Sequence, residues 1–249
     1  MRAFQFTKMQ GLGNDFVLIE GPQQLAAAEV SELCHRRFGI GADGVLVVTR
    51  GDPIRMDYWN ADGSPAEMCG NGLRCVARYS YDKGWAPDRN FSVQTPIGLR
   101  AVRVFEDRVE AELGRPVLNG IRSIQGAEYE LVDIGNPHAV AFVDDPASIE
   151  VAEVGSALQS EFPGGANVEF ASLNGAGVVM RVWERGVGET LACGTGIAAV
   201  AAVVAERFGL ESPVEVSVPG GQARVDIRDG VAWIVGPAEY SFRGSVGER

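Results

Sequence analysis

The stretch YWNADGSPAEMCGNG at residues 58–72 has a second copy in the same chain, VWERGVGETLACGTG at residues 182–196. Cys69 aligns with Cys193, and the tryptophans near the start of each stretch align at the same offset of 124 residues. Self-similarity at one offset is the sequence signature of a repeated structural unit. The chain is therefore predicted to contain two related halves.

Upstream polar residues support the repeat, because their spacing is nearly the same in both copies. In the first half they are Asn14, Asp43, Asn60 and Cys69, separated by 29, 17 and 9 residues. In the second half they are Asn136, Asn167, Glu184 and Cys193, separated by 31, 17 and 9 residues. We predict an N-terminal half at residues 1–115, completed by residues 238–249, and a C-terminal half at residues 116–237.

Each half is predicted to contain many short strands and one helix. The β-rich runs of the first half are separated by Gly, Pro and Asp-Gly punctuation: 16–20, 44–48, 55–59, 91–95, 99–105 and 108–113. After each repeated cysteine the pattern changes to a helical one. The segment GTGIAAVAAVVAERFG is apolar around most of its circumference, which is typical of a buried helix. The expected fold is α+β, with two pseudo-symmetric, mostly antiparallel mixed sheets, each wrapped around a central helix.

Composition excludes several classes of partner. The 249 residues include 33 acidic and 22 basic side chains, which gives a net charge of −11, and the basic residues are scattered. A nucleic acid or an anionic membrane surface needs clustered Lys and Arg, so neither is expected as a partner. The longest apolar run, Ile197–Ala205, is far shorter than the roughly 18 residues of a membrane helix. The first residues contain no apolar signal-peptide core, so we expect a cytoplasmic protein.

The four cysteines need not form disulfides in a reducing cytoplasm. They contain no C-x-x-C pair, and only two histidines accompany them, so no metal site is expected. Cys34 and Cys75 are interpreted as packing residues. His35 is interpreted as a residue on a solvated helix face, and the two repeated tryptophans as core residues. His138 follows a Gly-Asn-Pro turn and fits a site role as well as a structural one.

The repeated CG-x-G sequence predicts an acid–base site. It places a cysteine at a helix N-terminus, where backbone N–H groups lack intrahelical partners and glycine lets a ligand approach. The positive helix end also stabilises a thiolate, so we expect both thiol pKa values to be lowered toward neutrality. Two such thiols, one from each half, could invert a carbon: one removes a proton and the other delivers one to the opposite face.

These motifs resemble the diaminopimelate epimerase family. The resemblance covers about 230 residues and rests on the two CG-x-G motifs together with these segments: GLGNDF (11–16), FGIGADG (38–44), WNADG (59–63), GNPH (135–138), NVEF (167–170) and ERGVGET (184–190). It implies a cofactor-independent, PLP-free isomerase, a homodimer, and an active site between the halves. The implied reaction interconverts LL- and meso-2,6-diaminopimelate in lysine and peptidoglycan precursor biosynthesis. Some relatives carry Gln at the position of Gly44.

The resemblance also implies roles for individual residues. Cys69 and Cys193 would be the acid–base pair, and His138 and Glu184 would assist at the reacting amino end. The N–H groups of four helix-start residues would bind the reacting carboxylate: Gly70, Asn71, Gly194 and Thr195. The distal end of the substrate would contact five side chains: Asn14, Asn60, Asn136, Asn167 and Arg185. A planar, bidentate guanidinium suits a carboxylate.

Two other functions remain open from the sequence. A racemase of the same fold could act on another amino acid such as proline or histidine, although Arg185 and the four asparagines favour a substrate with a second charged end. A redox or binding protein could use the two repeated cysteines as a dithiol switch. The switch would not need Glu184, Arg185 or the asparagines. Glu184 and Arg185 could also be only a surface ion pair.

Overall fold

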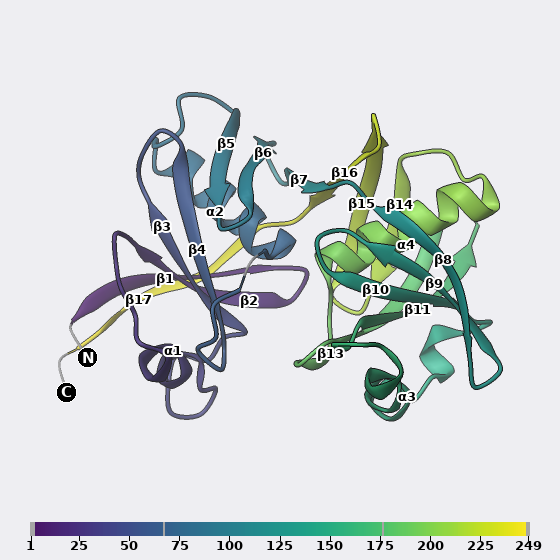
Figure 1. The fold of residues 1–249 in the computed structure, drawn as a ribbon. Helices are drawn as coiled ribbons and strands as arrows, with labels where there is room; N and C mark the ends of the chain where they lie inside the picture. The colour runs from purple at the N-terminus through teal and green to yellow at the C-terminus, as the bar shows by residue number, and fades with distance from the viewer. Residues whose placement is uncertain (1–2, 67, 176, 248–249) are drawn as a thin grey trace. The chain divides into compact units, whose positions relative to one another are not determined.

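The computed structural model describes residues 3–66, 68–175 and 177–247, and the chain divides into two compact units (Figure 1). The first unit comprises residues 1–111 and 236–249, and the second comprises residues 112–235. Residues 1–2 and 248–249, which belong to the predicted N-terminal half, lie outside the described residues.

The first unit is a mixed sheet completed by the last strand of the chain. Its strands are β1 (Phe4–Gly11), β2 (Asn14–Glu20), β3 (Gly44–Thr49), β4 (Ile54–Asn60), β5 (Asn90–Thr95), β6 (Gly98–Val104), β7 (Val109–Gly114) and β17 (Glu239–Val246). β17 pairs antiparallel with β1, which pairs antiparallel with β2. The pairs β2–β3 and β4–β5 are parallel, whereas β3–β4, β5–β6 and β6–β7 are antiparallel.

The second unit repeats this pattern of pairing. Its strands are β8 (Val117–Ile124), β9 (Ala127–Asp133), β10 (Pro137–Phe142), β11 (Asn167–Asn174), β12 (Gly177–Glu184), β13 (Gly188–Thr190), β14 (Val214–Val218), β15 (Gly221–Arg228) and β16 (Val231–Gly236). The pairs β10–β11 and β12–β14 are parallel, and β8–β9, β9–β10, β11–β12, β14–β15 and β15–β16 are antiparallel. β8 therefore takes the position in the second unit that β17 takes in the first.

One long helix lies within each sheet. α2 (Gly70–Asp82) packs against β1, β2, β3, β4 and β6, and α4 (Gly194–Phe208) packs against β9, β10, β11, β14 and β15 (Figure 1). Every residue of α4 from Gly194 to Val204 is buried, which explains why its sequence is apolar on all sides. The predicted fold class is confirmed.

Each unit also contains a second, shorter α-helix that the prediction of one helix per half omitted. α1 (Ala27–Cys34) lies between β2 and β3, and α3 (Val151–Leu158) lies between β10 and β11, flanked by the 3-10 turns η1 (Pro146–Ser148) and η2 (Gln159–Glu161). These are the connections that parallel strand pairs require. His35 is not on a helix face as predicted: it follows the end of α1, and its Nδ1 accepts the N–H groups of Arg37 and Phe38.

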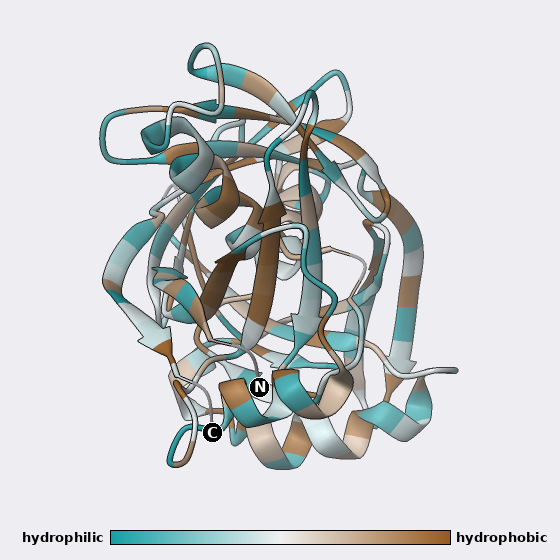
Figure 2. Cartoon of the chain, turned by 90° about the vertical axis from the view of Figure 1, so that its left-hand side faces the viewer, coloured by the Kyte–Doolittle hydropathy of each residue, from teal (hydrophilic) through white to brown (hydrophobic). Residues whose placement is uncertain are grey.

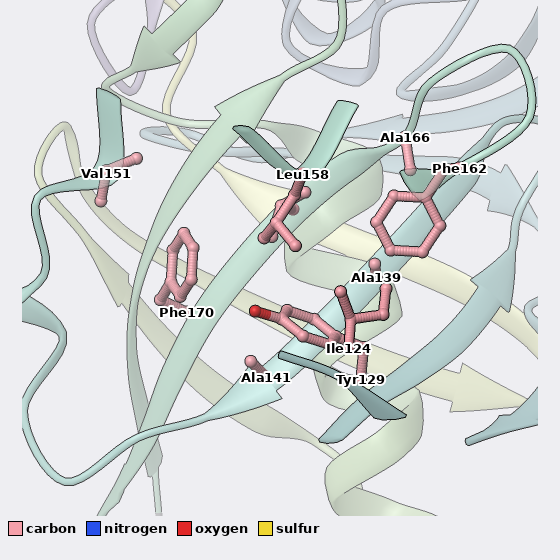
Figure 3. Packing of buried hydrophobic residues seen from close by; sticks show 10 residues of the cluster. Ile124, Tyr129, Ala139, Ala141, Val151, Leu158, Phe162, Ala166 and Phe170 are labelled. Atoms are coloured by element: carbon pink, nitrogen blue, oxygen red, sulfur yellow. The ribbon is translucent and has the colours of Figure 1, made fainter. Parts of the chain in front are cut away.

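Buried hydrophobic residues form the core of the chain. In Figure 2 the hydrophobic residues, drawn in brown, include the strands at the centre of the view, and many residues of the peripheral loops are hydrophilic. In the second unit a cluster beneath α3 includes Tyr129, Leu158, Phe162 and Phe170 (Figure 3). In the first unit the corresponding cluster lies under α1 and includes Val17, Val30 and Cys34. Trp59 and Trp183 pack against these two clusters as core residues. Among the described residues, no helix combines the length and apolarity needed to cross a membrane.

Candidate functional site

The Cys69 side chain caps the N-terminus of α2. Its Sγ accepts the N–H of Gly72 at 3.3 Å, and its backbone C=O accepts the N–H of Leu73. The helix starts here because Cys69 has extended backbone angles while the residues after it are small and helical. The thiol is consequently held at the mouth of the first turn, beside the N–H groups that an anion would use.

A chain of amides connects the Cys69 thiol to a buried guanidinium. Cys69 Sγ–H donates to Asn14 Oδ1 at 3.6 Å, Asn71 Nδ2 donates to the same oxygen at 3.2 Å, and Arg74 Nη2 donates to Asn71 Oδ1 at 2.9 Å. At the other end, Asn14 Nδ2 donates to Asp43 Oδ2 at 2.7 Å. Arginine only donates and a carboxylate only accepts, so the two ends fix the orientation of both amides.

Arg74 is wholly buried one turn into α2. Its other partners are the backbone oxygens of Pro237 at 3.2 Å and Gly70 at 3.4 Å. Space for the guanidinium comes from Gly11 and Gly236, where an added Cβ would lie 3.2 Å from its atoms. Burial lowers the pKa of Arg74 to about 10, so it still carries a positive charge at neutral pH.

Asn60 and Gly44 lie opposite each other on β4 and β3. Asn60 begins a turn in which its Nδ2 donates to Ser64 Oγ at 3.1 Å. A Cβ at Gly44 would lie 2.5 Å from Trp59 O and 2.5 Å from the Tyr58 ring. A side chain at position 44 therefore has no room without a shift of the neighbouring strand.

Cys193 has the same position at the start of α4 that Cys69 has at the start of α2. Its Sγ accepts the N–H of Gly196 at 3.4 Å and lies 3.4 Å from Thr195 Oγ1. Gly194 and Thr195 form the first turn, where helix geometry supplies no intrahelical acceptor for their N–H groups. Both predicted carboxylate cradles are thus helix starts that a cysteine caps.

The surroundings of Cys193 are acidic, and the expectation of a lowered pKa is wrong for this thiol. Burial, followed by the charges of Glu184 and Glu169, raises the pKa of Cys193 well above its usual value. Burial also raises the pKa of Glu184, against the hydrogen bonds donated by Thr190 and by the Cys193 thiol. The helix terminus cannot offset two neighbouring carboxylates, so Cys193 is a protonated thiol at rest.

His138 lies on β10 and is 2 % exposed. Its Nδ1 is 2.6 Å from Glu169 Oε1, and its Nε2 is 3.1 Å from Asn136 Oδ1. Asn136 Nδ2 in turn donates to Thr195 Oγ1 at 3.3 Å. The structure therefore brings five of the predicted residues together in what we call the Cys193 cluster, which Glu169 joins: Asn136, His138, Glu184, Cys193 and Thr195.

Asn167 and Arg185 form a second group in the same unit. Asn167 Oδ1 accepts the backbone N–H of Arg185 at 3.0 Å, and its Nδ2 donates to Pro137 O at 3.0 Å. The Arg185 guanidinium is exposed and donates to Gly164 O at 3.3 Å. Arg185 is not paired with Glu184, whose carboxylate faces Thr190, so the interpretation as a surface ion pair is wrong.

Glu169 and Arg74 are site residues that the sequence-based predictions do not include, although each lies within or directly beside a family motif. A signal was present for each: Glu169 is an acid inside the apolar strand run NVEF, and Arg74 is a charge between the buried residues Leu73 and Cys75. Cys75 is fully buried as predicted, and burial raises its pKa to about 12. Within residues 3–66, 68–175 and 177–247, no group of three or more His, Cys, Asp or Glu could hold a metal ion.

Comparison with known proteins agrees with this arrangement. The family model described as diaminopimelate epimerase matches residues 6–119 and 130–240, once for each half of the repeat. The chain belongs to the diaminopimelate epimerase family. A relative in Alkalilimnicola ehrlichii named diaminopimelate epimerase is 42% identical over 97% of this chain and 98% of its own length.

Solved structures more distant than this family share the fold. A Bacillus anthracis phenazine biosynthesis protein of the PhzF family has a TM-score of 0.80 at 16% identity, covering 99% of both chains. A hydroxyproline epimerase from Agrobacterium vitis, solved with trans-4-hydroxy-L-proline, has a TM-score of 0.74 at 15% identity, covering 99% of this chain and 91% of its own. This member of the diaminopimelate epimerase family thus has a fold that is used with other substrates.

The burial of Arg74 predicts a large effect on stability. Arg74→Met keeps the length of the side chain but removes the charged donor to Asn71 Oδ1, Pro237 O and Gly70 O. A hydrogen bond to a charged group contributes about 1.5–3 kcal/mol, so the free energy of unfolding should fall by roughly 2–5 kcal/mol in urea titrations. The exposed Arg50→Met is the matched control and should change it by less than about 0.5 kcal/mol. Equal values for both variants would contradict the assigned contacts.

The two capping thiols should differ in reactivity. Cys193 is 6 % exposed and has a raised pKa, so little thiolate is present near neutral pH and its alkylation should become fast only toward alkaline pH. Cys69 is half-buried and should react with iodoacetamide first, as peptide mapping would show. Glu184→Gln removes one negative charge and should speed alkylation of Cys193. Preferential labelling of Cys193 in the unmodified protein would contradict this description.

Proposed function

We propose that this isomerase interconverts LL- and meso-2,6-diaminopimelate by acid–base catalysis between Cys69 and Cys193. The observation that supports it most directly is the pair of thiols, each capping a buried helix at matching positions of the repeat. The relatives named diaminopimelate epimerase support this substrate, and the family resemblance implies the route, lysine and peptidoglycan precursor biosynthesis.

In the proposed reaction the α-carbon of the substrate loses one proton and gains another. A thiolate removes the α-proton, the electron pair of the C–H bond passes into the adjoining carboxylate, and the other thiol protonates the same carbon on its opposite face. Charge develops on the carboxylate oxygens, where N–H groups at the start of a helix stabilise it. Atoms and charge balance within the two thiols and the substrate, so the step itself requires no cofactor.

The environments of Cys193 and Cys69 suggest which of the two is protonated before substrate binds. Burial, with the charges of Glu184 and Glu169, raises the pKa of Cys193 and keeps it in its thiol form, so Cys193 is suited to deliver the first proton. Removal of the first proton then falls to Cys69, with the Arg74 charge nearby. Cys193 leaves this step as a thiolate and must regain a proton; Glu184, whose side chain is hydrogen-bonded to this sulfur and whose pKa is raised by burial, is placed to return one.

The remaining residues supply recognition of the substrate. We assign the exposed Arg185 guanidinium to binding of the distal carboxylate. Asn167 supports it by accepting the backbone N–H of Arg185. The other asparagines would form hydrogen bonds with the distal amino-acid group of the substrate: Asn14, Asn60 and Asn136. A dithiol switch would leave Arg185 and Glu184 without a purpose, which makes it the weaker candidate.

Assembly and location are proposals of the same kind. Family resemblance supports a homodimer, which light scattering of the purified protein would test. Catalysis by two free thiols needs a reducing compartment, and this supports a cytoplasmic location.

Single-cysteine variants test the reaction itself. Cys69→Ala and Cys193→Ala should each abolish conversion of LL-diaminopimelate to the meso form, because inversion needs an acid and a base at once. Cys75→Ala is the matched control: its thiol is buried inside α2, and most activity should remain. Either capping-cysteine variant with normal turnover, or a folded but inactive Cys75→Ala protein, would overturn the two-thiol assignment.

Arg185→Lys tests recognition of the distal end. Lysine keeps the charge but loses the bidentate fork, so diaminopimelate binding should weaken by about 1.5–3 kcal/mol when measured by calorimetry. The exposed Arg224→Lys is the matched control and should bind as the unmodified protein does. Amino acids without a distal carboxylate should lose much less affinity. An equal loss for both classes of ligand would show that Arg185 does not contact the distal carboxylate.

A further inference from the structure

We propose that Glu169 is a positioning residue for the reaction: from beneath the first turn of α4 it holds the His138 ring and, through Asn136 and Thr195, the Cys193 sulfur. The inference rests on the proposed function, because its effect on turnover presupposes that Cys193 acts on a substrate. The contacts that support it all lie within the second unit.

Four contacts form an unbroken line from the acid to the thiol. Glu169 Oε1 lies 2.6 Å from His138 Nδ1, and His138 Nε2 lies 3.1 Å from Asn136 Oδ1. Asn136 Nδ2 donates to Thr195 Oγ1 at 3.3 Å, and that oxygen lies 3.4 Å from Cys193 Sγ. The Glu169 carboxylate accepts from Nδ1 and so fixes the orientation of the ring, in which Nε2 faces the Asn136 side chain.

The strand pairing explains how Glu169 reaches His138. β10 and β11 are parallel, and His138 is paired with Asn167, two residues before Glu169. Residues two apart on a strand share a face, so Asn167, Glu169 and His138 lie on the same side of the sheet. α4 covers this side, because Gly196 in its first turn lies against Glu169 Oε1.

Glu169 is placed against the helix start itself. A Cβ added to Gly196 would come within 2.5 Å of Glu169 Oε1 and 3.3 Å of the Cys193 Cβ. Glycine at this position therefore makes room for the carboxylate directly beside the capping cysteine. The positive end of α4 also favours an anion here.

Stability alone does not account for an acid at this position. The Glu169 side chain is fully buried, and its Oε2 has no hydrogen-bond partner among the described residues. A buried carboxylate oxygen without a partner is unfavourable, and well-packed apolar residues often replace buried ion pairs without loss. The repeat shows such a replacement: the residue that aligns with Glu169 in the first half is the buried Val45.

Glu169→Val is consequently the decisive variant, because it introduces the residue of the other half and removes the carboxylate that contacts His138 Nδ1. We expect kcat for LL-diaminopimelate to fall about 10–100-fold, the range typical when the group that orients a metal-binding histidine is removed. KM should stay within about twofold, since the side chain does not touch substrate. Glu169→Gln keeps an acceptor oxygen for Nδ1–H, so it should retain more of kcat than the Val variant.

The exposed Glu211→Gln on the same unit is the matched control and should keep the kcat of the unmodified protein. A kcat for Glu169→Val equal to that of the unmodified protein would overturn the proposal. Equal losses in the Val and Gln variants, accompanied by matching losses of thermal stability, would also overturn it, because they would indicate a structural role. Should the Val variant not fold, Glu169→Gln carries the test: its kcat must lie below that of the unmodified protein.

A second measurement needs neither substrate nor turnover. The chain has only two histidines, so histidine-selective NMR resolves the His138 ring, with His35 as an internal reference. The Nδ1–H signal of His138 should be protected from exchange in the unmodified protein and lost in Glu169→Val. An unchanged signal in that variant contradicts the proposal. A protein with the protected signal but no diaminopimelate epimerase activity would instead refute the proposed function, so the two failures are distinguishable.

Discussion

A helix that begins inside a sheet must find acceptors or ligands for its first N–H groups, and this requirement organises both units. Cysteine sulfur satisfies one of these groups in each case, that of Gly72 in α2 and that of Gly196 in α4. The small residues after each cysteine leave the others accessible to an anion. A helix N-terminus capped by cysteine therefore provides a reactive thiol and N–H groups that can bind a carboxylate. The repeat provides this feature twice.

The two copies share their backbone pattern but bury opposite charges. Arg74 lies under the first helix start, where the second half has Ala198; Glu169 lies under the second, where the first half has Val45. Inversion of a carbon needs one thiol to accept a proton while the other supplies one. A symmetric pair of environments would give both thiols the same preference, so the opposite charges suit the reaction that the repeat makes possible.

The repeat, the buried α4 helix and most strands could be predicted from the sequence, because they depend on periodicity and on glycine and proline punctuation, which are local. The short helices α1 and α3 were omitted because they cover parallel strand pairs, and parallel pairing cannot be read from a local pattern. The role of Glu169 was omitted for a similar reason, since its partner His138 is on another strand. The pKa of Cys193 was predicted in the wrong direction because the helix end was visible in the sequence and the two flanking carboxylates were not.

The central claim is that two different thiols serve the two faces of one α-carbon, and the position of deuterium in early turnover tests it most directly. The enzyme is mixed with LL-diaminopimelate in deuterated water, and both isomers are recovered before equilibrium. With two thiols at work, the outgoing proton stays on one sulfur while the other sulfur delivers deuterium from solvent. The meso product should therefore carry deuterium at its inverted carbon, while the recovered LL substrate keeps its hydrogen. Meso product that retains the original hydrogen would show that one group both removes and returns the proton, and would contradict the claim.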